Sequence, residues 1–133
     1  MKQFQQVHVH LVYATANRVP VLTREVCDWL WPALAESARS VGCNYVVVGG
    51  VADHVHVLVA LPMAVAVAEV IRRLKGASSR LLHLRGLAEF AWQEGYGAFS
   101  ASRDHLAIVE AYVRNQPTHH LDNTTQNHLE THD

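Results

Sequence analysis

Two pairs of histidines stand out because each pair has the spacing of one side of a β-strand. His54 and His56 open the run HVHVLVAL, and His8 and His10 lie within QVHVHLVYAT. Residues i and i+2 of a strand point to the same side, about 7 Å apart along the backbone, so two imidazoles at this spacing can converge on one cation. The same spacing is also typical of two partly exposed histidines on a polar strand face. Spacing alone leaves both interpretations open for both pairs.

A second candidate group lies near the end of the chain, in HLAIVEAYVRNQPTHH. Tyr112 and Gln116 are four residues apart, which puts them on one face of a helix. Ile108 and Val109 lie on or near that face and can pack it against the protein. Without further context, the pattern favours a packed tyrosine whose hydroxyl finds a partner.

The elements that must position these residues follow from hydrophobic periodicity. Alternating or β-branched runs predict strands at 5–15, 43–50 and 54–61, and a fourth strand is expected after the glycine-rich loop at 90–100. Helical spacing of apolar residues predicts helices at 23–42 and 64–84. A third helix is expected from Ser102 or Asp104 to about Gln116. The order βαββαβ plus one helix predicts an α+β fold, a ferredoxin-like sheet with two helices on one face. Alternation puts His54 and His56, and likewise His8 and His10, on the opposite, open face, where the last helix can pack.

Helix boundaries have their own signals. Thr23 is the expected N-cap and Gly42 the expected stop of the first helix. Pro32 inside this segment predicts either a kink or a helix that begins near Trp31. Gly76 is expected to interrupt the second helix, at a cost of about 1 kcal/mol relative to alanine.

Composition sets the class of protein. The 133 residues are half hydrophobic, which suits one domain over 1–133 with a substantial core, and 118–133 has the polar composition of a disordered tail. No apolar run approaches the roughly 20 residues of a membrane span, and the start of the chain lacks a signal-peptide apolar region, so we expect a cytoplasmic protein. Cys27 and Cys43 form no CxxC and are expected to be free thiols.

The net charge of −1 demands no nucleic-acid partner, but the second helix carries a local basic stripe. Arg72, Arg73, Lys75 and Arg80 can bind phosphates, with Gly76 allowing close approach of a strand, or they can form a solvated helix face. Three aromatic residues leave a similar choice between stacking on unpaired bases and packing in the core: Trp92, Tyr96 and Phe99.

Five blocks in order give these residues a shared context: NRVPVL, VGGVADHVHVLVALP, RRLKGASSR, WQEGYGAFSAS, and YVRNQ with the following HH. Together they resemble the single-tyrosine HUH transposases of the insertion sequence 200/605 type, over nearly the whole chain. HUH denotes His, a bulky hydrophobe and His, here His54-Val55-His56. In the family this motif comes after the hairpin and has an acidic residue directly before it. Here that acidic residue is Asp53. The resemblance therefore selects His54 and His56 and leaves His8 and His10 as structural or peripheral.

The resemblance implies a mechanism. Tyr112 would attack a phosphorus of single-stranded DNA, giving a 5′-phosphotyrosine and a free 3′-OH, and His54, His56 and Gln116 would hold one divalent metal, Mg²⁺ or Mn²⁺. One ester replaces another, so no nucleotide cofactor is needed, and the sequence has no Walker A motif. The implied partners are DNA with hairpin ends and a second copy of the chain in a homodimer. The tyrosine then acts in cis or in trans.

Two alternatives remain open at this point. Pro117 disfavours helical geometry at Gln116, so the helix is expected to end or kink there, and His119 or His120 is a substitute ligand. The alternative function is a domesticated relative that binds or processes palindromic DNA hairpins without transposition. A phosphodiesterase with two His-x-Thr/Ser motifs fits less well, because both pairs here are His-Val-His.

Overall fold

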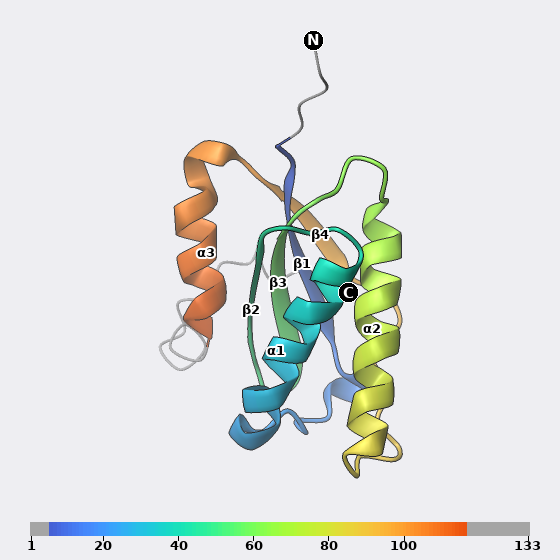
Figure 1. The fold of residues 1–133 in the computed structure, drawn as a ribbon. Helices are drawn as coiled ribbons and strands as arrows, with labels where there is room; N and C mark the ends of the chain where they lie inside the picture. The colour runs from blue at the N-terminus through green and yellow to red at the C-terminus, as the bar shows by residue number, and fades with distance from the viewer. Residues whose placement is uncertain (1–5, 117–133) are drawn as a thin grey trace.

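A four-stranded antiparallel sheet organises the chain in the computed structural model, in which residues 6–116 are described (Figure 1). The strands are β1 (His8–Ala14), β2 (Val46–Val51), β3 (His54–Ala60) and β4 (Gly97–Ala101), in the order β2-β3-β1-β4. The helices are α1 (Arg24–Ser40), α2 (Val67–Leu84) and α3 (Leu106–Arg114), with short 3-10 turns at Ala16–Arg18 and Arg103–His105. The predicted ferredoxin-like α+β fold is confirmed.

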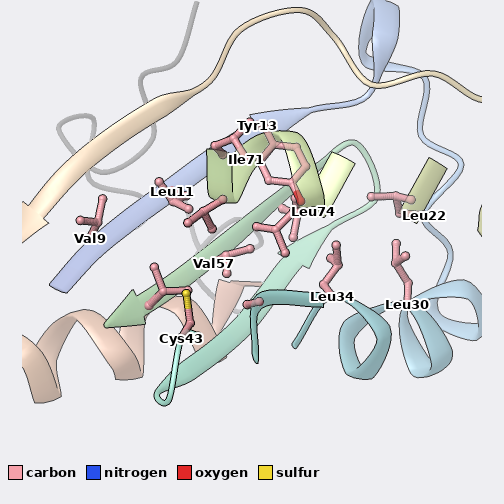
Figure 2. Packing of buried hydrophobic residues seen from close by; sticks show 14 of the residues in the cluster. Val9, Leu11, Tyr13, Leu22, Leu30, Leu34, Cys43, Val57, Ile71 and Leu74 are labelled. Carbon is pink, nitrogen blue, oxygen red and sulfur yellow. The ribbon is translucent and has the colours of Figure 1, made fainter. Parts of the chain in front are cut away.

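Helices α1 and α2 cover one face of the sheet, and the main core lies between these layers (Figures 1 and 2). From the strands, Leu11 and Val57 enter this core, as the alternation of β1 and β3 predicts. From the helices, Leu30, Leu34 and Leu74 meet them, each fully buried. Burying one such side chain contributes about 1.5–3 kcal/mol, so this layer fixes which side of each strand faces inward.

The start of α1 follows the sequence signal, because the Thr23 hydroxyl accepts a hydrogen bond from the Val26 amide at 3.3 Å. The helix then runs through Pro32, so the alternative start near Trp31 is wrong. Likewise α2 runs unbroken through Gly76, where an added Cβ would meet nothing within 4 Å. In both helices the apolar face packed on the sheet outweighs the local cost of proline or glycine.

Helix α3 packs on the other face of the sheet, which the sequence left open (Figure 1). Val109 and Val113 of α3 form a second, smaller core with Leu58 of β3 and Val47 of β2. The expectation that Ile108 also packs there is wrong, since this side chain is 61% exposed. Helix α3 of this chain thus covers the histidine face of its own sheet.

Other expectations concern the chain as a whole. Cys27 and Cys43 are free thiols, as predicted. Within residues 6–116, no helix combines the length and apolar character needed to cross a bilayer. The predicted polar tail at 118–133 lies outside the described residues.

Candidate active site

Strand β3 carries the two histidines of the HUH motif on the face that α3 covers. His54 and His56 are 1% and 0% exposed, and their ring centroids lie 5.1 Å apart with the ring planes at 62°. They share this face because a strand alternates its side chains, as the spacing predicts. Two buried imidazoles side by side are costly unless their ring nitrogens have partners.

His54 has its partners at the turn that precedes β3. Its Nδ1 donates to Asp53 Oδ1 at 2.8 Å, because a carboxylate only accepts. Arg18 Nε donates to Asp53 Oδ2 at 3.2 Å. Burial raises the pKa of Asp53, but hydrogen bonds from His54 and Arg18 and the charge of Arg18 outweigh it and hold this pKa below its ordinary value. The carboxylate is therefore ionised at neutral pH and orients His54.

Arg18 reaches this position from a strained turn. Asn17 and Arg18 have φ of 57° and 54°, the left-handed region that costs a non-glycine residue about 1–2 kcal/mol. Asparagine tolerates this region, whereas arginine does not favour it. The turn is held by Thr15, whose hydroxyl donates to the Val19 carbonyl at 2.9 Å. Such strain persists only where surrounding contacts impose it, here beside the HUH motif.

His56 has a hydrogen-bond partner on β1, which decides between the two expectations for His10. His10 is fully buried, and its Nε2 lies 2.8 Å from His56 Nδ1 with the two rings nearly parallel at 22°. Of the two expectations for His10, structural or peripheral, this burial excludes the peripheral one and agrees with the structural one. His8 is different, because it is only half-buried and its ring contacts Tyr45 edge-on at 5.4 Å.

Tyr112 projects from α3 toward the same histidines. Its ring lies edge-on to His56 at 5.9 Å and to His10 at 6.4 Å between centroids, and the residue is 3% exposed. The Tyr45 hydroxyl donates a hydrogen bond to the Glu110 carboxylate, which ties α3 to the start of β2. The tyrosine and the HUH motif that meet here belong to one chain.

Helix α3 ends at Arg114 and a turn follows at Asn115, so the break expected at Gln116 lies just before it, and Gln116 itself is helical. It is fully buried, and its Nε2 donates to the Tyr112 carbonyl at 3.1 Å. Its Oε1 is buried and has no hydrogen-bond partner within residues 6–116. The substitute ligands His119 and His120 lie outside the described residues.

These side chains suit a divalent cation by their chemistry. Imidazole nitrogens bind transition metals such as Mn²⁺, and an amide oxygen is a ligand that Mg²⁺ and Mn²⁺ accept. The Oε1 of Gln116 is buried and accepts no hydrogen bond from residues 6–116, so it is available as a ligand oxygen. Within residues 6–116, no three His, Cys, Asp or Glu side chains are grouped so that they could hold a metal ion.

Comparison with known proteins identifies the family. The family model described as "Transposase IS200 like" matches residues 3–116. The chain belongs to the IS200-like transposases. It is 28% identical over 118 residues to the ISDra2 transposase TnpA of Deinococcus radiodurans, covering 84% of each protein.

Two solved structures share the fold of this IS200-like transposase. A crystal structure of a protein from Deinococcus radiodurans R1 assigned as a transposase has a TM-score of 0.69 at 24% identity, covering 93% of this chain and 98% of that one. A REP-associated tyrosine transposase bound to a REP hairpin has a TM-score of 0.65 at 16% identity, covering 90% and 74%.

The basic stripe of the transposase divides into two kinds of residue. Arg72, Arg73 and Arg80 are exposed on α2, with Arg72 paired to Glu69 at 2.6 Å. Lys75 instead donates to the carbonyls of Gln93 and Gly95 at 2.8 and 2.7 Å, so its contacts fasten the loop before β4. Burial lowers the pKa of Lys75. The stripe lies on the layer opposite α3, away from the histidine face (Figure 1).

The three aromatic residues before and in β4 have different surroundings. Trp92 packs at the main core and its Nε1 donates to Ser78 Oγ at 3.0 Å, which favours the core interpretation. Tyr96 is 37% exposed. Phe99 is half-buried with its ring centroid 6.1 Å from that of His10, so it borders the histidine face.

Sequence reasoning missed two residues of this site, His10 and Arg18. Both residues come near the HUH motif only because β1 pairs with β3. In this register His10 lies opposite Leu58 and Val12 lies opposite His56, so His10 is the diagonal neighbour of His56. Arg18 follows β1 and meets Asp53 at the turn before β3. The one available signal was that both His-Val-His runs place their histidines on the open face.

Proposed function

We propose that this transposase cleaves and rejoins single-stranded DNA at insertion-sequence ends, through a 5′-phosphotyrosine at Tyr112 and with Mg²⁺ or Mn²⁺ held by His54, His56 and Gln116. The observation that carries the proposal is the contact between the Tyr112 ring and His56 on one buried face, 5.9 Å between centroids. This contact supports a site in which Tyr112 and the two histidines act on one phosphate once α3 has moved to admit the DNA.

The reaction balances without a nucleotide. The Tyr112 oxygen forms a bond to phosphorus, the bond from phosphorus to the 3′ oxygen breaks, the phenol proton is lost and the departing oxygen gains a proton. A bound divalent cation would polarise the phosphate and stabilise charge on the leaving oxygen. Attack by another strand's 3′-OH on the phosphotyrosine restores the phenol and joins DNA. The phenol, with a reference pKa of about 10, needs such activation near neutral pH.

Access to this site requires α3 to move. The described tyrosine and both HUH histidines are at most 3% exposed, so a DNA strand cannot reach them while α3 lies on the sheet. A homodimer offers one way to use such motion, since a released α3 can complete the site of a second copy. The DNA partner proposed is a single strand with a hairpin end, supported by the structural relative that is bound to a REP hairpin.

The test is formation of a covalent adduct. The purified full chain, given Mn²⁺ or Mg²⁺ and single-stranded oligonucleotides that cover the DNA flanking its gene, should yield a protein–DNA adduct on denaturing gels. Tyr112→Phe should abolish the adduct, and chelation of the metal should do the same. Tyr96→Phe is the matched control and should leave it unchanged, because Tyr96 lies outside the site. An adduct that survives in Tyr112→Phe contradicts the assignment.

The alternative, a domesticated relative that binds or processes palindromic hairpins without transposition, is supported by the same hairpin-bound relative. It predicts hairpin binding without strand transfer. Gel-shift of a flanking hairpin with no adduct and no joined product would favour it, and the absence of paired hairpins at both sides of the gene would agree.

A further inference from the structure

His10 and His56 form a buried imidazole pair that spans two strands of the sheet. Both residues are fully buried, and His10 Nε2 lies 2.8 Å from His56 Nδ1. His10 lies on β1 and His56 on β3, on the face covered by α3, and the pairing register makes them diagonal neighbours. The contact is therefore fixed by the sheet itself and not by a loop.

The hydrogen bond has two tautomeric forms. Either His10 donates Nε2–H to His56 Nδ1, or His56 donates Nδ1–H to His10 Nε2. A neutral imidazole binds a cation through the nitrogen that carries the lone pair. In the first form His56 Nδ1 is that nitrogen and already accepts a hydrogen bond, whereas in the second form His56 Nε2 carries the lone pair.

His54 is an example of a histidine that donates through Nδ1, as His56 does in the second form. Its Nδ1 donates to the Asp53 carboxylate at 2.8 Å, which makes Nε2 the lone-pair nitrogen of His54. Metal-binding histidines generally donate their other ring N–H to such a partner, and the partner fixes the tautomer and the ring orientation. The two HUH histidines then match, with an anionic partner for one and a neutral, buried partner for the other.

We propose that His10 is a positioning residue that accepts the Nδ1–H of His56 and thereby holds His56 Nε2 as its metal-binding nitrogen. This inference rests on the proposed function, because it assigns a role toward the metal of that site. A neutral acceptor orients His56 without adding a second negative charge beside the phosphate that must bind there.

The first experiment reads the tautomer directly in the metal-free full chain. Nitrogen-15 NMR of the histidine rings should show His56 protonated at Nδ1, with the resonances assigned by their loss in His56→Gln. The same state should persist in His10→Gln, whose amide oxygen can accept the hydrogen bond. In His10→Leu, which has no acceptor, the population should shift toward Nε2–H. A His56 ring protonated at Nε2 in the wild-type chain overturns the proposal.

The second experiment measures binding of Mn²⁺ alone by calorimetry. His10→Leu should weaken the affinity about tenfold to a hundredfold, the usual effect of losing the partner of a metal-binding histidine, and His10→Gln should largely restore it. His8→Leu is the matched control: it lies on the same strand and the same side, but its ring contacts Tyr45, so the affinity should not change. Equal losses of Mn²⁺ affinity in His10→Leu and His10→Gln would show that His10 contributes only by packing, and would overturn the proposal.

The outcomes separate this inference from the proposed function. A wild-type chain that neither binds Mn²⁺ nor forms the adduct contradicts both. A wild-type chain that does both, while His10→Leu binds Mn²⁺ as tightly, contradicts only the role of His10. Should His10→Leu fail to fold, the tautomer of His56 in the wild-type chain and in His10→Gln still decides.

Discussion

Gly49 of β2 lies directly under the Val113 carbonyl of α3. A Cβ built on Gly49 would stand 2.0 Å from the Val113 oxygen and 2.9 Å from its carbon, far inside contact distance. Only a residue without a side chain lets α3 lie this close to the sheet. The neighbouring Tyr112 reaches the histidine face because its helix can approach the sheet here.

The first prediction concerns this close approach. Gly49→Ala should destabilise the protein by about 1–3 kcal/mol and reduce the hydrogen-exchange protection of α3, because backbone must shift to admit the methyl group. Urea unfolding and hydrogen exchange measure the two effects. Gly76→Ala is the opposite control: it lies in open space on α2 and should stabilise by about 0.5–1 kcal/mol. An unchanged α3 in Gly49→Ala would show that the helix is not seated as described.

The second prediction concerns the HUH histidines. His54→Ala should lower adduct formation by about a hundredfold or more, since loss of a proposed metal ligand would remove several kcal/mol of transition-state stabilisation. Hairpin binding, measured by gel-shift, should persist. His8→Ala should keep both activities. Equal loss of cleavage in His54→Ala and His8→Ala would mean that the pair of His8 and His10 is also needed for cleavage.

The third prediction separates two residues of the basic stripe. Lys75→Met should lower the free energy of unfolding by about 1–3 kcal/mol, because it leaves the carbonyls of Gln93 and Gly95 without their donor. Arg73→Ala should change stability by no more than about 0.5 kcal/mol. If Arg73 binds a phosphate, its loss should reduce the slope of log affinity against log salt by roughly one. An unaltered slope would assign Arg73 to the solvated face.

The fourth prediction concerns the tie between Tyr45 and Glu110. Burial, together with the hydrogen bond to Glu110 and the charge of that carboxylate, raises the pKa of Tyr45 to about 12, against about 10 in the unfolded chain. A raised folded-state pKa gives stability that is complete below pH 10 and is lost as the pH rises toward 12. The stability difference between the wild type and Tyr45→Phe should therefore shrink over this range.

Urea unfolding at a series of pH values measures this difference. Tyr13 is buried and its pKa is also raised, but it is present in both proteins, so its contribution cancels. A difference that stays constant up to pH 12 would show that the pKa of Tyr45 is not raised in the folded protein.

The sequence by itself determined the elements and the faces of the strands. The alternation in β1 and β3 predicted which residues meet α1 and α2, because a strand that buries one side must repeat every second residue. It also placed the four histidines on the opposite side and Tyr112 with Gln116 on one helix face. Local signals such as the Thr23 cap held, whereas Pro32 and Gly76 did not end their helices, since tertiary packing outweighs local propensity.

Only the tertiary structure decided which histidines meet. His8 and His10 have the same spacing as His54 and His56, so no local pattern separates them. Pairing of β1 with β3 puts His10 against His56 and leaves His8 beside Tyr45. Contacts between residues 46 positions apart depend on the order and register of the strands. That order arises from packing of the whole sheet, which is why the partner of His56 could not be read from the residues around either pair.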